Sequence, residues 1–157
     1  MRIIAFADTH GSFSAANKIL SSNQYCDHFI FLGDGMEEIE HIRSIFPEKK
    51  FYCVSGNCDR SDEPLSRTIE LFNTKIFMTH GHLFDVRNTY DKLIERAAED
   101  NASIILFGHT HCRTYGNIKG FHILNPGSAA QPKDREPPGY AVIEITPCGF
   151  SFMHVDV

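Results

Sequence analysis

The sequence lacks the features that would point at once to a membrane protein or a general nucleic-acid-binding protein. No stretch approaches the ~20 consecutive apolar residues that a membrane-spanning helix requires. No run of lysine and arginine is longer than a pair, and the formal net charge of the 157 residues is −5. Since non-specific nucleic-acid binding depends on neutralising many phosphates, we expect neither a membrane protein nor a nucleic-acid binder.

Cysteine is present without the patterns that give it a structural role. The five cysteines are odd in number, and no C-x-x-C motif occurs among them. This argues against a disulfide framework and against a thiolate zinc module. A secretory leader is not expected either, because Asp8 and His10 interrupt the apolar N-terminal run. We therefore expect reduced cysteines and a cytoplasmic protein.

No internal repeat, low-complexity tract or long linker divides the chain, so residues 1–157 are expected to form a single domain. Apolar runs that are typical of buried strands alternate with amphipathic segments that have helical spacing. We expect strands at 2–7, 28–32, 50–54, 68–72, 74–79 and 103–107, and helices at 14–22, 36–46 and 89–100. Further strands are expected at 113–118, 120–124, 139–145 and 150–155. The alternation indicates βαβ units, and the later strands suggest a second, antiparallel sheet, with two sheets packed inside and helices outside.

Polar residues beside glycine follow five of these expected strands. In chain order the motifs are DTHG (8–11), GDG (33–35), GNCD (56–59), HGH (80–82) and GHTH (108–111). Each motif alone fits a turn or a loop with solvated histidines. Five in register are harder to explain in this way, because ligands of α/β sheets bind beyond the carboxyl ends of the strands. The sequence therefore predicts a metal site at one rim.

The chemistry of the candidate ligands narrows the metal. Carboxylates, imidazoles and one amide suit Zn, Mn, Fe, Co or Ni rather than Ca or Mg alone. The candidates are Asp8, His10, Asp34, Asn57, His80, His109 and His111. They are too many for one tetrahedral zinc, but they match two ions if one carboxylate bridges them. Two ions about 4 Å apart suit in-line displacement at phosphorus.

The five motifs, in this order and strand context, resemble the signatures of the calcineurin-like metallophosphoesterase superfamily. In detail they are similar to its small, single-domain YfcE-type phosphodiesterases, and NPGS (125–128) also resembles that branch. The resemblance covers essentially the whole chain. It implies an α/β fold in the form of a four-layer αββα sandwich, with two mixed β-sheets flanked by helices.

The resemblance also implies the ligand sets of two divalent transition-metal ions. Asp8 and His10 would hold the first ion with Asp34 and His111. Asp34 would bridge to the second ion, which Asn57, His80 and His109 complete. We expect both ions to be manganese, with Ni, Co, Zn or Fe as alternatives. The reaction implied is attack of a metal-bridging hydroxide on phosphorus. We expect Asp34, Asn57 and His82 as catalytic residues, with His82 a candidate for contacting a metal ligand or the phosphate.

The third motif departs from the broad superfamily, which usually has histidine where this chain has Cys58. That histidine is thought to protonate the leaving oxygen, whereas a thiol with a pKa near 8.5 is a poorer donor to an alkoxide. Cys58 is either an inert filler or a redox-sensitive acid, and we favour the filler. Without a strong acid, substrates with good leaving groups should react best, which points to diesters.

Three hypotheses for function follow. The first is a cytoplasmic phosphodiesterase acting on a small phosphodiester. The second is a non-catalytic interaction scaffold like the retromer subunit Vps29, which the intact ligand set disfavours. The third is phosphomonoesterase or nuclease action, which Cys58 and the acidic charge disfavour. Asp59 is a candidate for orienting Asn57 or a neighbouring loop, and Arg60 and Arg113 are candidates for contacting phosphate. The physiological diester, the native metal and a homo-oligomeric state are left open.

Overall fold

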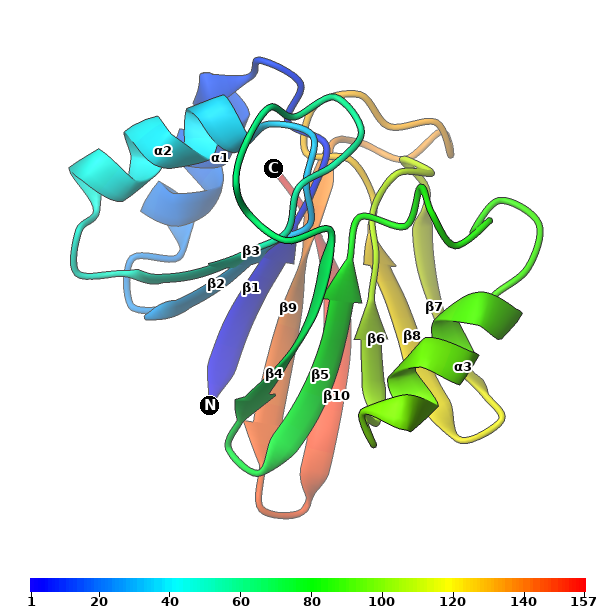
Figure 1. Ribbon diagram of the computed structural model, residues 1–157. Helices are drawn as coiled ribbons and strands as arrows, with labels where there is room; N and C mark the ends of the chain where they lie inside the picture. Colours follow the sequence, from blue (N-terminus) through cyan, green and yellow to red (C-terminus); the bar gives the residue numbers. More distant parts are fainter.

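Two five-stranded β-sheets face each other in a computed structural model that describes residues 1–157, and three helices cover their outer faces (Figure 1). The strands are β1 Arg2–Phe6, β2 His28–Phe31, β3 Lys50–Cys53, β4 Ser66–Leu71, β5 Thr74–Thr79, β6 Ile104–Leu106, β7 Arg113–Ile118, β8 Phe121–Pro126, β9 Gly139–Thr146 and β10 Gly149–Asp156. The helices are α1 Phe13–Ser22, α2 Met36–Ile45 and α3 Asp91–Glu99.

Both sheets mix parallel and antiparallel strands. The first has the order β10-β9-β1-β2-β3, in which β1, β2 and β3 are parallel. The second has the order β4-β5-β6-β8-β7, in which β5, β6 and β8 are parallel. Each sheet therefore brings the carboxyl ends of its parallel strands to a common edge, which is where the five motifs begin.

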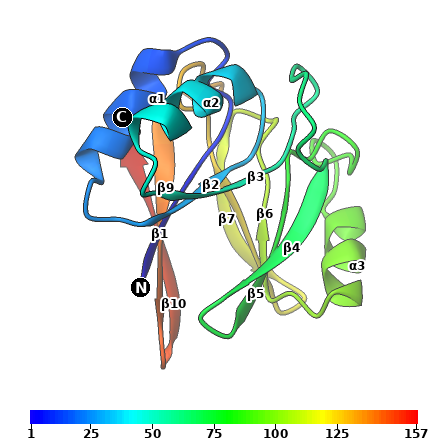
Figure 2. The same ribbon diagram turned by 60° about the vertical axis from the view of Figure 1, so that its left-hand side comes forward.

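The continuous apolar run of β1 is explained by burial on both of its faces. Ile3 and Ala5 belong to the core between the two sheets, while Ile4 and Phe6 belong to the core under α1 and α2. Successive side chains of a strand point to opposite faces, so a strand between two layers needs apolar residues at every position. A third core lies between the second sheet and α3, which gives four layers (Figure 2).

The helices form where local signals and an apolar face coincide. Ser12 caps α1 by accepting the Ala15 N–H at 3.3 Å, and the helix buries Ile19 and Leu20. In α3 the buried residues Leu93, Ile94 and Ala97 lie on one side, as the helical spacing predicts. None of the three helices is long and apolar enough to cross a membrane.

The predicted four-layer sandwich is confirmed, whereas the predicted separate antiparallel sheet is wrong. The last four strands are divided between the sheets: β7 and β8 join β6, and β9 and β10 join β1. The pattern of apolar residues identifies strands but not the strands with which they pair. The sequence therefore did not predict that residues 127–138 cross from the second sheet back to the first. The hairpin at Asn73 is confirmed, and all five cysteines are free.

Candidate metal centre

The loops after β1, β2, β3, β5 and β6 meet at one rim that spans the two sheets. β1 and β5 both end toward the top of Figure 1, where these loops gather. Hydrogen bonds cross between the sheets at this rim: His80 Nδ1 bonds with the Leu32 carbonyl at 2.7 Å, and the His109 N–H donates to Asp8 Oδ2 at 3.2 Å. The rim is therefore one site built from both sheets.

Three of the predicted ligands form a cluster around the end of β1. His111 Nε2 lies 3.4 Å from Asp8 Oδ1, and His10 Nε2 lies 3.8 Å from the same oxygen. The two imidazoles approach each other to 3.2 Å between their Nε2 atoms. One carboxylate oxygen and two imidazole nitrogens thus face a common point, which is a suitable donor set for a divalent transition metal.

Asp34 connects this cluster to a second one. Its Oδ2 atom lies 3.8 Å from His10 Nε2 and 3.4 Å from His80 Nε2. The ligand atoms of Asp8, Asp34 and His80 form a further group that could hold an ion. The same oxygen of Asp34 therefore faces both groups, which is the position that a bridging ligand requires.

Two of the imidazoles are held so that Nε2 points into the centre. His80 Nδ1 bonds with the Leu32 carbonyl and His111 Nδ1 with the Gln131 carbonyl, both at 2.7 Å. A hydrogen bond from one ring nitrogen to a backbone carbonyl fixes the tautomer that leaves the other nitrogen free for a metal.

Buried atoms without partners also mark the centre. Asp8 Oδ1, His80 Nε2 and His82 Nδ1 are buried and make no hydrogen bond. Buried polar groups are normally hydrogen-bonded, because leaving one unpaired costs about 1–3 kcal/mol. Asp8 and His80 belong to one of the groups whose ligand atoms could hold an ion, and unpartnered oxygen and nitrogen atoms there fit a bound cation, so these residues suit the metals that the family implies.

Burial and neighbouring charges shift the pKa values of the ionisable residues at the metal centre. Burial raises the pKa of Asp8 to about 7. Burial also acts to raise the pKa of Asp34, but His80 and the Cys58 N–H outweigh it and lower this pKa below its usual range. Burial lowers the pKa of His109 to about 4, with His80 adding to the effect. His109 is therefore neutral at pH 7, as metal binding requires.

The backbone at the predicted ligands is unusual. Five of them have positive φ angles: Asp8 at 56°, His10 at 43°, Asp34 at 60°, His109 at 67° and His111 at 60°. This left-handed conformation costs about 1–2 kcal/mol for a residue other than glycine. Such conformations cluster at functional sites, where the surrounding structure holds them in place.

Two motif glycines allow the loops to approach so closely. A Cβ atom at Gly56 would collide with Oδ1 and the backbone nitrogen of Asp34. A Cβ at Gly33 would lie 2.5 Å from the Gly56 nitrogen and 3.0 Å from His80 Nδ1. The absence of side chains at these positions lets the loops after β2, β3 and β5 pack around Asp34.

Three predicted site residues lie at the edge of the clusters. The Asn57 side chain is exposed, and its Nδ2 donates to Cys58 Sγ at 3.3 Å instead of facing the centre. The ring centroids of His109 and His82 lie 5.2 and 5.5 Å from that of His80, and 6.3 Å from each other. The structure therefore gathers Asp8, His10, Asp34, His80 and His111 most closely, with the other three around them.

Cys58 holds Asp34 through its backbone. The Cys58 N–H donates to Asp34 Oδ1 at 2.8 Å, which leaves Oδ2 to face the histidines. Cys58 is exposed, and its thiol lies near His10 and Asp34. Partial desolvation, a hydrogen bond with Asp34 and the Asp34 charge raise the thiol pKa. The thiol is therefore protonated at neutral pH, and it remains a weak acid.

Asp59 has a role that the sequence indicated only vaguely. Its Oδ1 accepts the N–H groups of Gly35 and Met36 at 2.7 and 2.9 Å, and its Oδ2 accepts those of Asp34 and Gly56 at 2.7 and 2.8 Å. One carboxylate thus caps α2 and joins the loops after β2 and β3. Asp59 orients the Asp34 loop rather than Asn57.

The NPGS segment (residues 125–128) holds two loops of the rim in place through hydrogen bonds. Asn125 Nδ2 donates to the Gly108 carbonyl at 2.8 Å, and the Ser128 hydroxyl donates to the Asp8 carbonyl at 2.8 Å. Arg113 donates hydrogen bonds to Asp156 and to the Pro137 carbonyl. The Arg113 guanidinium thus joins the segment between β8 and β9 to the end of β10, and phosphate contact by Arg113 stays a prediction.

The fold and this rim of carboxylates and imidazoles define the chain as a metallophosphoesterase-type α/β sandwich. A model of the calcineurin-like phosphoesterase superfamily domain matches residues 1–147, and the chain belongs to this superfamily. The family predicted from the five motifs is thus confirmed.

Two bacterial relatives support the same assignment. The probable metallophosphoesterase YsnB of Bacillus subtilis is 30% identical over 148 residues, which cover 92% of this chain and 85% of YsnB. Phosphodiesterase YfcE of Escherichia coli K12 is 27% identical over 173 residues, which cover 92% of this chain and 88% of YfcE.

Solved structures share the fold over nearly the whole chain. A predicted phosphoesterase from Streptococcus pneumoniae TIGR4 has a TM-score of 0.79 and 27% identity, and the match covers 98% of this chain and 97% of that one. Vps29 of Entamoeba histolytica, solved with Zn²⁺, has a TM-score of 0.74 and 18% identity, and the match covers 99% of each chain. At that identity the likeness to Vps29 concerns the fold alone.

Proposed function

We propose that the protein is a dinuclear-metal phosphodiesterase that hydrolyses a small phosphodiester. The observation that carries the proposal is the position of Asp34 Oδ2, which faces His10 Nε2 on one side and His80 Nε2 on the other. A single bridging carboxylate between two donor groups is the arrangement that two ions require. The superfamily membership and the name of YfcE agree with this reading.

In this proposal the seven ligands divide between two ions. Asp8, His10 and His111 hold one, His80, His109 and Asn57 hold the other, and Asp34 is shared. Asn57 has to turn its amide away from Cys58 to take this role. When bound, divalent ions such as Mn²⁺ polarise a phosphate and lower the pKa of a water molecule, which is the chemistry that diester hydrolysis needs.

The remaining side chains position the substrate and set its leaving group. His82 lies beside His80, and burial lowers its pKa, so it is a neutral imidazole whose Nε2, the ring nitrogen that is not buried, can bond a phosphate oxygen. The raised pKa of the Cys58 thiol makes it a poor proton donor to an alkoxide. Diesters with good leaving groups are therefore the expected substrates.

The test compares hydrolysis of bis-p-nitrophenyl phosphate and p-nitrophenyl phosphate by metal-stripped protein with Mn, Ni, Co, Zn or Mg added back. We expect metal-dependent turnover that favours the diester. Asp34→Asn should abolish it while circular dichroism shows a folded protein, and Asp62→Asn, an exposed acid in the loop after β3, should not.

Either of two results would overturn the proposal. Wild-type turnover in Asp34→Asn would remove the bridging role. Absence of turnover with every metal, in a folded protein that binds two ions, would instead favour an interaction scaffold on the fold shared with Vps29.

A further inference from the structure

The segment that crosses from β8 to β9 (residues 127–138) brings a lysine to the metal centre. This segment passes over the top of Figure 1, where the motif loops gather. His111 Nδ1 bonds with the Gln131 carbonyl at 2.7 Å, and the Lys133 N–H donates to the His111 carbonyl at 3.0 Å. Lys133 is therefore attached directly to one of the predicted metal ligands.

The backbone on both sides of Lys133 is held in place. Pro132 has a fixed φ angle, and the Asp134 carboxylate accepts the N–H groups of Arg113 and Glu136. A binding group on a rigid backbone loses less conformational entropy when its ligand binds. The segment therefore presents the Lys133 side chain from a fixed position.

The Lys133 ammonium has no partner in the chain. Lys133 is exposed and forms no ion pair, and the neighbouring Asp134 carboxylate is already bonded to backbone N–H groups. Its charge nevertheless acts on the centre. Burial raises the pKa of Asp8 to about 7 against the effect of Lys133, and burial and Lys133 both lower the pKa of His111. An unpaired cation at this place indicates that the substrate supplies an anion.

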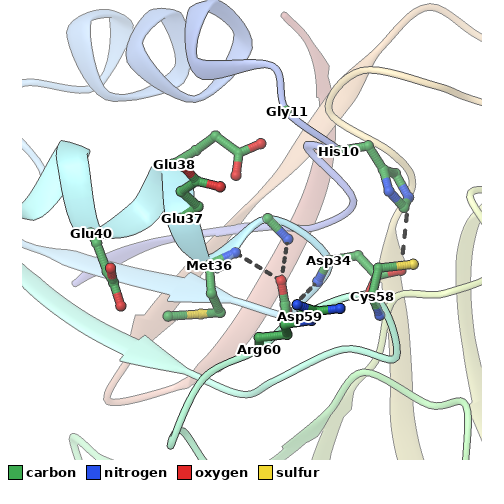
Figure 3. A pocket seen from close by; sticks show the side chains of 11 residues that line it. His10, Gly11, Asp34, Met36, Glu37, Glu38, Glu40, Cys58, Asp59 and Arg60 are labelled. Atoms are coloured by element: carbon green, nitrogen blue, oxygen red, sulfur yellow. Dashed lines mark hydrogen bonds and ion pairs between the residues drawn. The ribbon is translucent and has the colours of Figure 1, made fainter.

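The opposite charge gathers on another side of the centre. A pocket of about 520 Å³ lies between the motif loops and the start of α2, and Lys133 is not among the residues that line it. Figure 3 shows three glutamates of α2 at this pocket: Glu37, Glu38 and Glu40. Arg60 is the one lysine or arginine in the lining. Like charges repel, so an anionic substrate group is disfavoured here and favoured beside Lys133.

We propose that Lys133 is a specificity-determining residue that binds an anionic group on one alcohol of the phosphodiester. This inference rests on the proposed function. The reacting phosphate belongs at the metal ligands, and Lys133 forms no ion pair with Asp8, so its ammonium is placed for a group farther out on the substrate. A lysine ammonium is a compact charge with three donors, which suits a carboxylate or a phosphate.

The test uses two matched esters, p-nitrophenyl 3-carboxypropyl phosphate and p-nitrophenyl 3-carbamoylpropyl phosphate, with Mn²⁺-loaded protein. They share a leaving group and nearly the same shape, and they differ in the negative charge. We expect kcat/KM to favour the carboxypropyl ester by about fivefold, the upper range for an exposed ion pair. Lys133→Gln should lower this ratio toward one, and Lys133→Arg should retain it. Lys92→Gln, which changes an exposed lysine on α3, should leave the ratio as in the wild type.

Arg87 gives a second comparison, because it is an exposed cation on the side of the other ion. Its charge adds to the effects of burial and His80 that lower the pKa of His109. Arg87→Gln should leave the ratio unchanged if the anionic group binds beside Lys133.

Three results would overturn the role of Lys133 while hydrolysis of bis-p-nitrophenyl phosphate still supports the proposed function. They are a wild-type ratio of one or below, a ratio that Lys133→Gln does not lower, and a ratio that Arg87→Gln lowers in its place. Absence of turnover of all three diesters would overturn both proposals.

Discussion

Replacement of Asp59 by alanine should weaken both the fold and the metal centre. The carboxylate accepts four backbone N–H groups at 2.7–2.9 Å, two of them at the start of α2 and one from Asp34 itself. A hydrogen bond to a charged group is worth about 1.5–3 kcal/mol, and loss of an N-cap costs about 0.5–2 kcal/mol. The four bonds share one carboxylate, and water would replace some of them. We therefore expect a loss of about 3 kcal/mol rather than the full sum.

For a chain of this length, 1 kcal/mol shifts Tm by about 2–4 °C, so the expected decrease is about 6–12 °C. Asp59 also holds Asp34 at its positive φ angle of 60°. Loss of a residue that orients a ligand typically weakens metal binding by about 10–100-fold. Thermal denaturation with EDTA would measure the first effect, and calorimetric titration with Mn²⁺ would measure the second.

The matched control is Asp62→Ala, because Asp62 is an exposed acid in the same loop. It should change neither Tm nor Mn²⁺ affinity. If Asp59→Ala behaved like Asp62→Ala in both measurements, the capping and bridging role of the Asp59 carboxylate would be refuted. A lower Tm with unchanged Mn²⁺ affinity would limit Asp59 to stabilising α2.

Two further predictions concern the ligands. Burial raises the pKa of Asp8 to about 7, above ~3.9 in an unfolded chain, so the stability linked to Asp8 is complete below about pH 4 and is lost as the pH rises to about 7. With EDTA present, Asp8→Asn should therefore gain Tm relative to wild type between pH 5 and pH 8, and a constant difference would contradict the assignment. Mn²⁺ at 100 times its Kd should stabilise the wild-type protein by ~2.7 kcal/mol. His80→Ala should lose most of this gain in Tm, and an equal gain would show that His80 does not bind the metal.

Much of the site could be predicted because its residues follow buried strands directly. The apolar runs of β1, β2 and β6 are unambiguous. Parallel pairing of β1 with β2 places Asp8 and Asp34 at adjacent strand ends, and parallel pairing of β5 with β6 does the same for His80 and His109 in the other sheet. The position of each motif directly after a buried strand was therefore enough to predict that the motifs meet at a common rim. The same reasoning identified His80 and His111, which the structure brings close to the two aspartates.

Contacts between distant segments could not be predicted from local patterns. Asp59 lies in one loop and caps a helix that begins in another, so neither segment shows the bond by itself. The pairing of β9 with β1 and the turn of Asn57 toward Cys58 likewise depend on packing rather than on periodicity.

The central claim is that two ions bridged by Asp34 hydrolyse a phosphodiester. Its most direct test adds Mn²⁺ stepwise to metal-stripped protein, at protein concentrations well above Kd, while bis-p-nitrophenyl phosphate hydrolysis is followed. We expect activity to reach its maximum at two equivalents per chain and Asp34→Asn to stay inactive throughout. Full activity at one equivalent, or no activity with two ions bound, would contradict it.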